Sequence, residues 1–159
     1  MTLRHLSLSC CSTFSLFALM ACQRIDPVVY ECQELLETIN NVVIEAQTIT
    51  QSEQMAEGEE PNLDIWLQAA DILSKGSEAI ANVNIDDSIL QNYQTQVSDI
   101  YNEQAQATYT MVEAWQKKDL EKAMAAQARA QTAGQLEKTT GESLNNYCQD
   151  KEKELPSAP

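Results

Sequence analysis

Apolar and small side chains recur every three or four residues along most of the chain, which is the spacing of one face of an α-helix. In the first run they are Val29, Cys32, Leu35, Leu36, Ile39, Val42, Val43, Ala46 and Ile49. Asp26 fits the N-cap of this helix and Pro27 its first turn. The stretch Gly-Glu-Glu-Pro at 58–61 interrupts the pattern, because glycine caps a helix and proline cannot continue its hydrogen bonds. The spacing therefore predicts a helix from Pro27 to between Met55 and Glu57.

Two further helices are predicted in the middle of the chain. Asn62 is a suitable N-cap for the second helix, and Gly76 weakens its middle by about 1 kcal/mol relative to alanine. The apolar face of the second helix holds Leu63, Trp66, Leu67, Ala70, Leu73, Ile80 and Val83. The polar stretch 82–86 ends it, and Asp86 or Asp87 caps the third helix. The face of the third helix holds Leu90, Tyr93, Val97, Ile100, Tyr101, Gln104, Thr108, Met111 and Trp115, so we expect its aromatic side chains in the core.

A fourth helix follows the sequence Lys-Lys-Asp at 117–119. The two lysines suit the negative end of the third helix, and Asp119 caps the fourth, which runs to about Asp150. Its face holds Leu120, Ala123, Met124, Gln127, Ala130, Gly134, Gly141, Leu144 and Cys148. Because small residues bury little area, we expect this helix to be the least stable locally. Residues 151–159 are typical of a disordered tail.

Four helices with short connections predict an all-α fold over residues 28–150, an antiparallel up-down-up-down four-helix bundle. In that topology the start of the first helix and the end of the fourth lie at the same end of the bundle. Cys32 and Cys148 sit on the apolar faces of those two helices at that end. The topology therefore places these two cysteines near each other.

The first 21 residues are a segment of another kind. Arg4 provides a positive charge, and an apolar run interrupted by Ser and Thr follows at 6–21, which is too short for a spanning helix. The run ends in Leu-Met-Ala-Cys at 19–22, with leucine at −3, a small residue at −1 and cysteine at +1. This segment resembles the lipobox of bacterial lipoproteins. The alternatives are an ordinary cleaved secretory signal, which prefers small residues at −3 and −1, and an uncleaved anchor.

The resemblance covers only the leader and Cys22, and it implies export and lipidation. Residues 1–21 would be a cleaved signal peptide, and Cys22 would carry diacylglycerol on its sulfur and an acyl chain on its amine. Several buried acyl chains, at about 0.8 kcal/mol per CH₂, anchor a protein durably. Residues 22–27 would then be a lipidated tether, and the protein would face the periplasm or the exterior from a membrane of the cell envelope.

The cysteine count becomes informative if the chain is exported to an oxidising compartment. Once the leader is removed and Cys22 is lipidated, only Cys32 and Cys148 remain, and such a pair favours a disulfide. Closing so long a loop restricts the unfolded chain by up to about 4.7 kcal/mol in the entropy description. Two buried free thiols are the alternative, and a metal site is less favoured because two cysteines without histidine do not complete a tetrahedral shell.

Composition argues against most catalytic functions. The chain is strongly acidic, with a formal net charge of −14, which repels nucleic acid and anionic headgroups. Its single histidine, His5, lies in the leader, so the mature chain lacks His-based acid–base, nucleophilic and di-iron chemistry. We therefore expect no enzymatic activity, no cofactor, no bound metal and no nucleic-acid partner.

Two functional hypotheses are favoured over a third, catalysis by carboxylates alone. The first is a lipid-anchored helical bundle that acts as a binding, adaptor or structural module of the cell envelope, with an unknown envelope protein as partner. The second is an envelope sensor or carrier that holds a small ligand between its helices. A carrier needs a closed apolar cavity with convergent polar groups, whereas a binding module needs an exposed apolar patch. Trp66 and Tyr109 are the sequence-based candidates for a contact surface, because Tyr109 lies about 160° around its helix from Tyr93.

Overall fold

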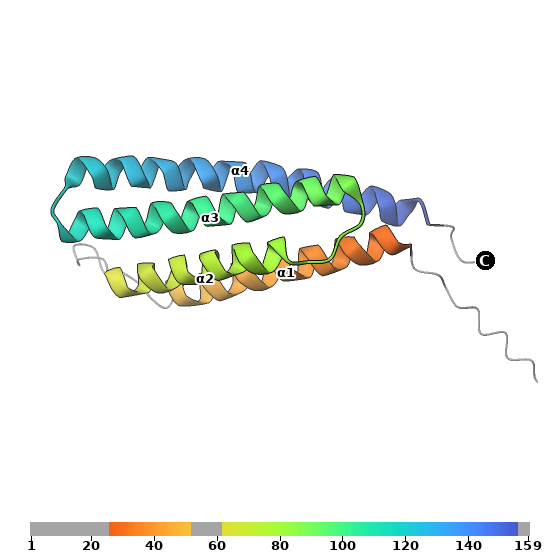
Figure 1. Ribbon diagram of the computed structural model, residues 1–159, viewed down its shortest axis with the longest axis horizontal. Helices are drawn as coiled ribbons and strands as arrows, with labels where there is room; N and C mark the ends of the chain where they lie inside the picture. Colours follow the sequence, from red (N-terminus) through yellow and green to blue (C-terminus); the bar gives the residue numbers. More distant parts are fainter. Residues whose placement is uncertain (1–25, 52–61, 156–159) are drawn as a thin grey trace, which may run out of the picture.

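The computed structural model describes residues 26–51 and 62–155, and within these ranges the regular structure is entirely helical. The helices are α1 (Pro27–Gln51), α2 (Leu63–Ala81), α3 (Ser88–Gln116) and α4 (Leu120–Lys153). They pack along one another into an elongated bundle (Figure 1). The prediction of an all-helical fold with four helices packed together is confirmed. In the described ranges, no helix combines the length and apolar character needed to cross a bilayer.

Side-chain caps determine where the four helices begin. Asp26, Asn62, Asp87 and Asp119 each accept a hydrogen bond from a backbone amide two or three residues further on. Each cap satisfies a donor that would otherwise lack a partner in the first helical turn. The predicted caps are therefore confirmed, and of the two candidates for α3 it is Asp87 that serves.

The structure describes α1 as far as Gln51, so its predicted end at 55–57 lies outside the described residues. α4 continues three residues beyond Asp150, where the sequence pattern favoured a tail. Lys151 and Lys153 each form an ion pair with an acidic side chain three positions away, both at 2.9 Å. Lysines in the last turn also suit the negative end of a helix, so the chain stays helical there.

The helices are not equally packed against their neighbours. α3 lies along both α2 and α4, and α1 lies mainly along α2, with few contacts to α3 and α4. The start of α1 and the end of α4 meet at one end of the bundle, which we call the disulfide end (Figure 1). The short connection from α3 to α4 lies at the opposite end, which we call the turn end. One side of the bundle, between α1 and α4, is therefore sparsely filled.

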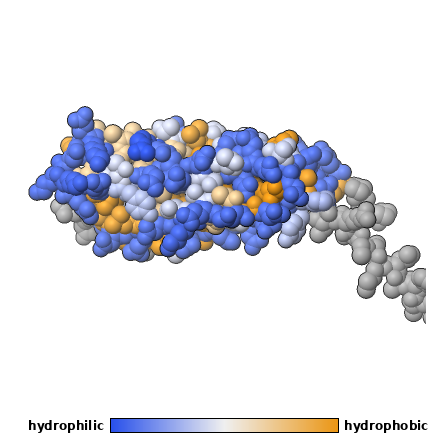
Figure 2. All heavy atoms as spheres, viewed as in Figure 1, coloured by the Kyte–Doolittle hydropathy of each residue, from blue (hydrophilic) through white to orange (hydrophobic). Residues whose placement is uncertain are grey.

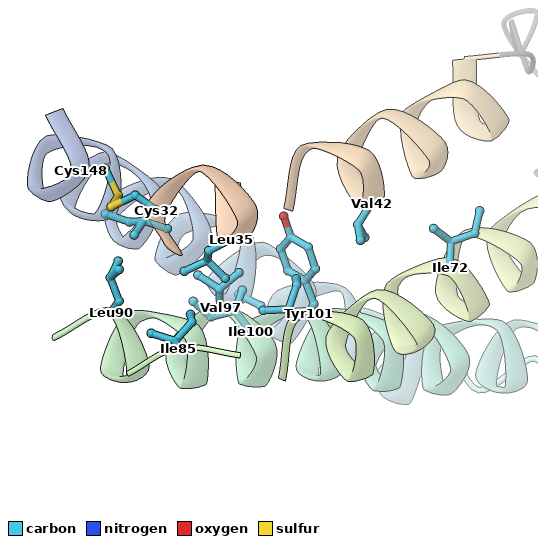
Figure 3. Packing of buried hydrophobic residues seen from close by; sticks show 13 residues of the cluster. Cys32, Leu35, Val42, Ile72, Ile85, Leu90, Val97, Ile100, Tyr101 and Cys148 are labelled. Carbon is cyan, nitrogen blue, oxygen red and sulfur yellow. A yellow bond between two sulfur atoms is a disulfide. The ribbon is translucent and has the colours of Figure 1, made fainter. Parts of the chain in front are cut away.

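The buried core runs along the bundle from the disulfide end (Figure 3). It contains Cys32, Leu35, Val42, Ile72, Ile80, Ile85, Leu90, Val97, Ile100, Tyr101, Ala133, Leu144 and Cys148. Cys32 and Cys148 form the expected disulfide, with 5.7 Å between their Cα atoms, and both are almost fully buried. Leu35 and Tyr101 have no exposed surface, as their positions in the apolar pattern predicted.

The predicted inward faces of α3 and α4 are confirmed in part and corrected near the connection between the two helices. Buried as predicted are Leu90, Val97, Ile100, Tyr101, Thr108, Ala123, Leu144 and Cys148. Trp115, expected in the core, is 48% exposed, while Ala105, Val112 and Ala114 are buried on α3. On α4 the buried residues are Ala123, Ala126, Ala133, Thr140, Leu144 and Cys148. Leu120 and Met124, also expected inside, are more than 60% exposed. The reason is that α3 and α4 are in close contact. Small side chains such as alanine fit between their backbones, whereas larger side chains do not.

The small residues on the predicted face of α4 suggested a close approach by a neighbouring helix, but Gly134 and Gly141 do not serve that purpose. A Cβ built on Gly134 or Gly141 would have no atom of another residue within 4 Å apart from neighbouring chain atoms. These glycines therefore do not allow a close approach by another helix. Because glycine has no side chain, the surface of α4 is instead recessed where it faces α1.

Candidate functional site

The most distinctive surface of the molecule is apolar and lies at the turn end. Three large apolar side chains within ten residues of one another are exposed there: Trp115 at 48%, Leu120 at 64% and Met124 at 62%. We call these three residues the tip surface. The other large exposed hydrophobic residues of the described ranges are Tyr30, Ile44, Ile89 and Leu136. Most of the face drawn in Figure 2 is hydrophilic, with apolar residues in separate groups.

The turn between α3 and α4 brings the tip surface together. Lys118 adopts φ 56°, in the left-handed region, which lets the chain reverse within a few residues. The amide of Asp119 then donates to the carbonyl of Ala114 at 2.9 Å, so the start of α4 is held against the last turn of α3. Trp115 and Leu120 consequently line one shallow hollow of about 230 Å³. The hollow is lined by Ala114, Trp115, Lys118, Asp119, Leu120 and Ala123.

Met124 extends the same surface by one helical turn. It follows Leu120 by four residues, which places both side chains on one face of α4. Neither side chain packs into the core, because the face of α4 toward α3 is occupied by Ala123 and Ala126. The tip surface is therefore a consequence of the alanine-lined contact between α3 and α4.

The charges around the tip surface balance, unlike those of the whole chain. Between residues 113 and 122 three lysines stand beside three acidic residues, whereas the chain as a whole has a net charge of −14. Lys117 forms an ion pair with Glu113 at 2.5 Å, and Lys122 lies 3.6 Å from the same carboxylate. The hydrogen bond and the positive charge of Lys117 hold the pKa of Glu113 below its usual value. The tip surface is thus locally neutral on an acidic molecule.

A second concave surface lies between α1 and α4, and we call it the α1–α4 groove. It has a volume of about 510 Å³ and is open to solvent. Its lining residues are Leu36, Ile39, Asn40, Val43, Val97, Tyr101, Gly134, Glu137, Lys138, Gly141, Glu142, Leu144 and Asn145. Among the polar lining residues, Glu137 accepts from the Tyr101 hydroxyl at 3.0 Å and from the side-chain amide of Gln104 at 2.8 Å. Burial and the neighbouring Glu137 carboxylate raise the pKa of Tyr101.

A polar network holds three helices together at the disulfide end. The Asp87 carboxylate accepts from the amides of Ile89 and Leu90 and from the Tyr147 hydroxyl at 3.0 Å. The Asp87 amide donates to the buried carboxylate of Glu31 on α1 at 3.1 Å. Burial raises the pKa of Asp87, but these hydrogen bonds outweigh it and hold the pKa below its usual value. These hydrogen bonds link α1, the start of α3 and α4 through the side chains of Glu31, Asp87 and Tyr147.

The two aromatic residues that the sequence singled out lie elsewhere. Trp66 and Tyr109 are both half-buried. The Tyr109 hydroxyl donates to the Asp71 carboxylate, which links α3 to α2. Burial and this hydrogen bond raise the pKa of Tyr109 to about 12. The aromatic residue at the exposed apolar surface is Trp115. The sequence pattern placed Trp115 in the core instead, because its spacing from Thr108 and Met111 also fits an inward face.

The described residues hold no cluster of side chains suited to bind a metal ion. Across 26–51 and 62–155, no three Asp, Glu, Cys or His side chains converge as metal ligands would. In the same ranges, every buried side-chain oxygen and nitrogen has a hydrogen-bond partner. Cys22, the predicted lipidation site, lies outside the described residues. Comparison of the chain with known protein families, curated proteins and solved structures finds no significant match.

Proposed function

We propose that this protein is a lipid-anchored, exported, non-enzymatic module of the cell envelope that binds its partner through the tip surface. In the antiparallel up-down-up-down arrangement that we propose, the tether at 22–27 leaves from the disulfide end. The single observation that supports binding at the tip is the exposure of Trp115, Leu120 and Met124 together at the other end. Tryptophan and large apolar side chains that cluster on a surface are typical of binding sites.

The length of the bundle gives the tip surface its position. α4 has 34 residues, so at 1.5 Å per residue it spans about 50 Å. Cys22 precedes the first residue of α1 by only five positions. Acyl chains on Cys22 would therefore hold the disulfide end at the membrane and present the tip surface about 50 Å away. This placement suits an adaptor that reaches from its own membrane toward a partner.

A carrier function is the second candidate, and the α1–α4 groove is the observation in its favour. The groove has a volume of about 510 Å³ and a mixed apolar and polar lining that includes the Glu137 carboxylate. Two features favour the binding module instead. The groove is open rather than closed, and both oxygens of Glu137 already accept hydrogen bonds from the protein.

Intact-mass analysis of the protein from its native membrane tests the anchor. The expected mass corresponds to a chain that begins at Cys22, carries acyl groups and has lost two hydrogens to the disulfide. A Cys22→Ser variant is expected to lack the acyl groups and to leave the membrane fraction. If the serine variant matures and partitions into membranes as the parent does, the anchor proposal is wrong.

A photo-reactive amino acid at position 120 tests binding at the tip in living cells. We expect a discrete cross-linked product from position 120 that disappears in the Met124→Ser background. The matched control is position 44 on α1, where Ile44 is equally exposed, at 61%, but lies apart from the tip surface. Identical products from positions 44 and 120, or none from position 120, would contradict the proposal.

A further inference from the structure

The α1–α4 groove begins one helical turn from the disulfide, at the end of the bundle from which the proposed tether leaves. We propose that, away from a membrane, the mature protein holds one acyl chain of its own Cys22 in this groove. This occupancy rests on the lipidation proposed above and goes beyond it, because it gives the groove an occupant and the protein a distinct state in water. The lining of the groove, its volume and the reach of the tether support it.

The groove has an apolar interior and a polar rim. Its apolar members are buried or half-buried: Leu36, Ile39, Val43, Val97 and Leu144. Its exposed members are polar or glycine: Asn40, Lys138, Gly141, Glu142 and Asn145. Glu137 is half-buried, and both of its oxygens already accept hydrogen bonds from the protein. A hydrocarbon chain can therefore leave water against the interior while the charged side chains of the rim stay hydrated.

The volume of the groove matches one fatty acyl chain. A methylene group is about as large as a water molecule, which takes about 30 Å³ in the liquid. The groove of about 510 Å³ therefore holds about 17 methylenes, which is the length of one ordinary acyl chain. It does not suit a second copy of the protein, because a stable dimer buries about 20–30 residues on each side and the groove is lined by 13.

The tether is long enough to bring an acyl chain to the groove. The near end of the groove is at Leu36, nine positions after Pro27, which is about 14 Å along α1. The five residues from Cys22 to Asp26 span up to about 17 Å when extended. Turned back along α1, they bring the Cys22 sulfur beside Leu36. From there the groove continues to Val43, away from the disulfide end.

Covalent attachment favours the protein's own acyl chain over free lipid. A tethered chain enters the groove in an intramolecular step, so its effective concentration there does not depend on the protein concentration. The groove removes one chain from water, whereas a bilayer removes all of them. The chain is therefore expected to leave the groove when the protein reaches a membrane. This agrees with the proposed anchor and leaves the tip surface free for its partner.

A synthetic acyl chain on Cys22 tests this proposal. In the mature chain with the disulfide formed, Cys22 is the only free thiol, so it can be alkylated with a hexadecyl group or, as the control, with a methyl group. The hexadecyl group is expected to raise the urea midpoint, because the folded chain offers the groove and the unfolded chain does not. A hexadecyl group that ends in a photo-reactive diazirine is expected to label residues 36–43 and 134–145. Added phosphatidylcholine vesicles should abolish this labelling.

Two glycines of α4 allow the groove to be filled without disturbing the core. A Cβ on Gly134 or Gly141 has open space around it, so Gly134→Leu with Gly141→Leu occupies the groove itself. In this variant the hexadecyl and methyl proteins are expected to have the same urea midpoint. The matched control is Gln135→Leu with Ser143→Leu, at exposed positions outside the lining, which should keep the difference. Equal midpoints in the parent protein, or diazirine labelling elsewhere, would overturn the proposal.

Sedimentation of the hexadecyl protein separates its own groove from that of a neighbour. We expect a monomer, and labelling that appears only as a dimer forms would mean that the chain enters another copy, which would also overturn the proposal. Because the probe is attached chemically, its failure to enter the groove would leave the anchor intact. Native protein without acyl groups, found by the intact-mass analysis, would remove both the anchor and the occupant of the groove.

Discussion

Gly76 on α2 lies directly against Val42 on α1, and there is no room between them for a methyl group. A Cβ built on Gly76 would stand 2.7 Å from Cγ2 of Val42 and closer still to Cγ1. The sequence indicated only the cost of this glycine, about 1 kcal/mol of helix propensity. The structure shows that the close approach of α1 and α2 offsets that cost. This contact matters for α1, because α1 has few contacts with the other helices.

The first prediction concerns that contact. Gly76→Ala is expected to destabilise the protein by about 1–3 kcal/mol, because overpacking outweighs the gain in helix propensity. Gly134→Ala is the matched control, since nothing lies within 4 Å of its Cβ position, and it is expected to stabilise by about 0.4–1 kcal/mol. Urea unfolding of both variants measures the difference. Equal effects of the same sign would contradict the packing argument.

The second prediction concerns the disulfide. The loop between Cys32 and Cys148 is long, and α1 has few other contacts with α4. Replacing both cysteines by alanine is expected to cost about 2–5 kcal/mol of unfolding free energy. A reducing agent should lower the urea midpoint of the parent protein and leave that of the double variant unchanged. A parent protein that is insensitive to full reduction would be inconsistent with this role.

The third prediction concerns acid stability. The folded-state pKa of Asp87 is below its usual value. The ionised carboxylate therefore stabilises the folded state at pH values above the unfolded-state pKa, about 3.9. The contribution is lost as the pH falls through the folded-state pKa. Asp87→Asn keeps a capping oxygen but does not titrate, so its stability should depend less on pH below about 4. Asp87→Ala should cost about 0.5–2 kcal/mol at neutral pH. Parallel acid-unfolding curves for the parent and Asp87→Asn would refute this prediction.

The fourth prediction concerns alkaline stability. Burial and the bond to Asp71 raise the pKa of Tyr109 to about 12, and burial and the bond to Asp87 do the same for Tyr147. Because the folded-state pKa is raised, the neutral tyrosines stabilise the folded state below the unfolded-state pKa, about 10. This contribution to stability is lost as the pH rises toward 12. Asp71→Asn should move the titration of Tyr109 back toward 10. Tyrosinate absorbance against pH, with Tyr109→Phe to assign the signal, measures this; no shift in Asp71→Asn would contradict the assigned cause.

The fifth prediction separates binding from folding. Leu120→Ser with Met124→Ser should change stability by no more than about 0.5 kcal/mol per site, because both side chains are exposed. Leu144→Ala, on the buried face of the same helix, should cost about 2–5 kcal/mol. Thermal unfolding checks both. A large loss of stability in the serine variant would mean that the tip surface is part of the core.

The sequence by itself determined the local features of this protein. Asp26, Asn62 and Asp119 mark helix starts because a capping side chain needs only the next few amides, and this interaction does not depend on distant residues. The pairing of Cys32 with Cys148 also followed from the sequence, because helix count and short connections place those two positions at one end. These conclusions depend on spacing along the chain.

Only the tertiary structure decided which residues of α3 and α4 turn inward near the connection between these helices. Trp115, Leu120 and Met124 fit the helical repeat, and so do the smaller residues Ala114, Ala123 and Ala126. Hydrophobicity alone ranks the larger residues first, but the distance between the two backbones favours alanine and leaves the larger side chains in solvent. That distance depends on the whole bundle, and it is absent from any local pattern. The same holds for the contact of Gly76 with Val42, where the space available is set by a second helix.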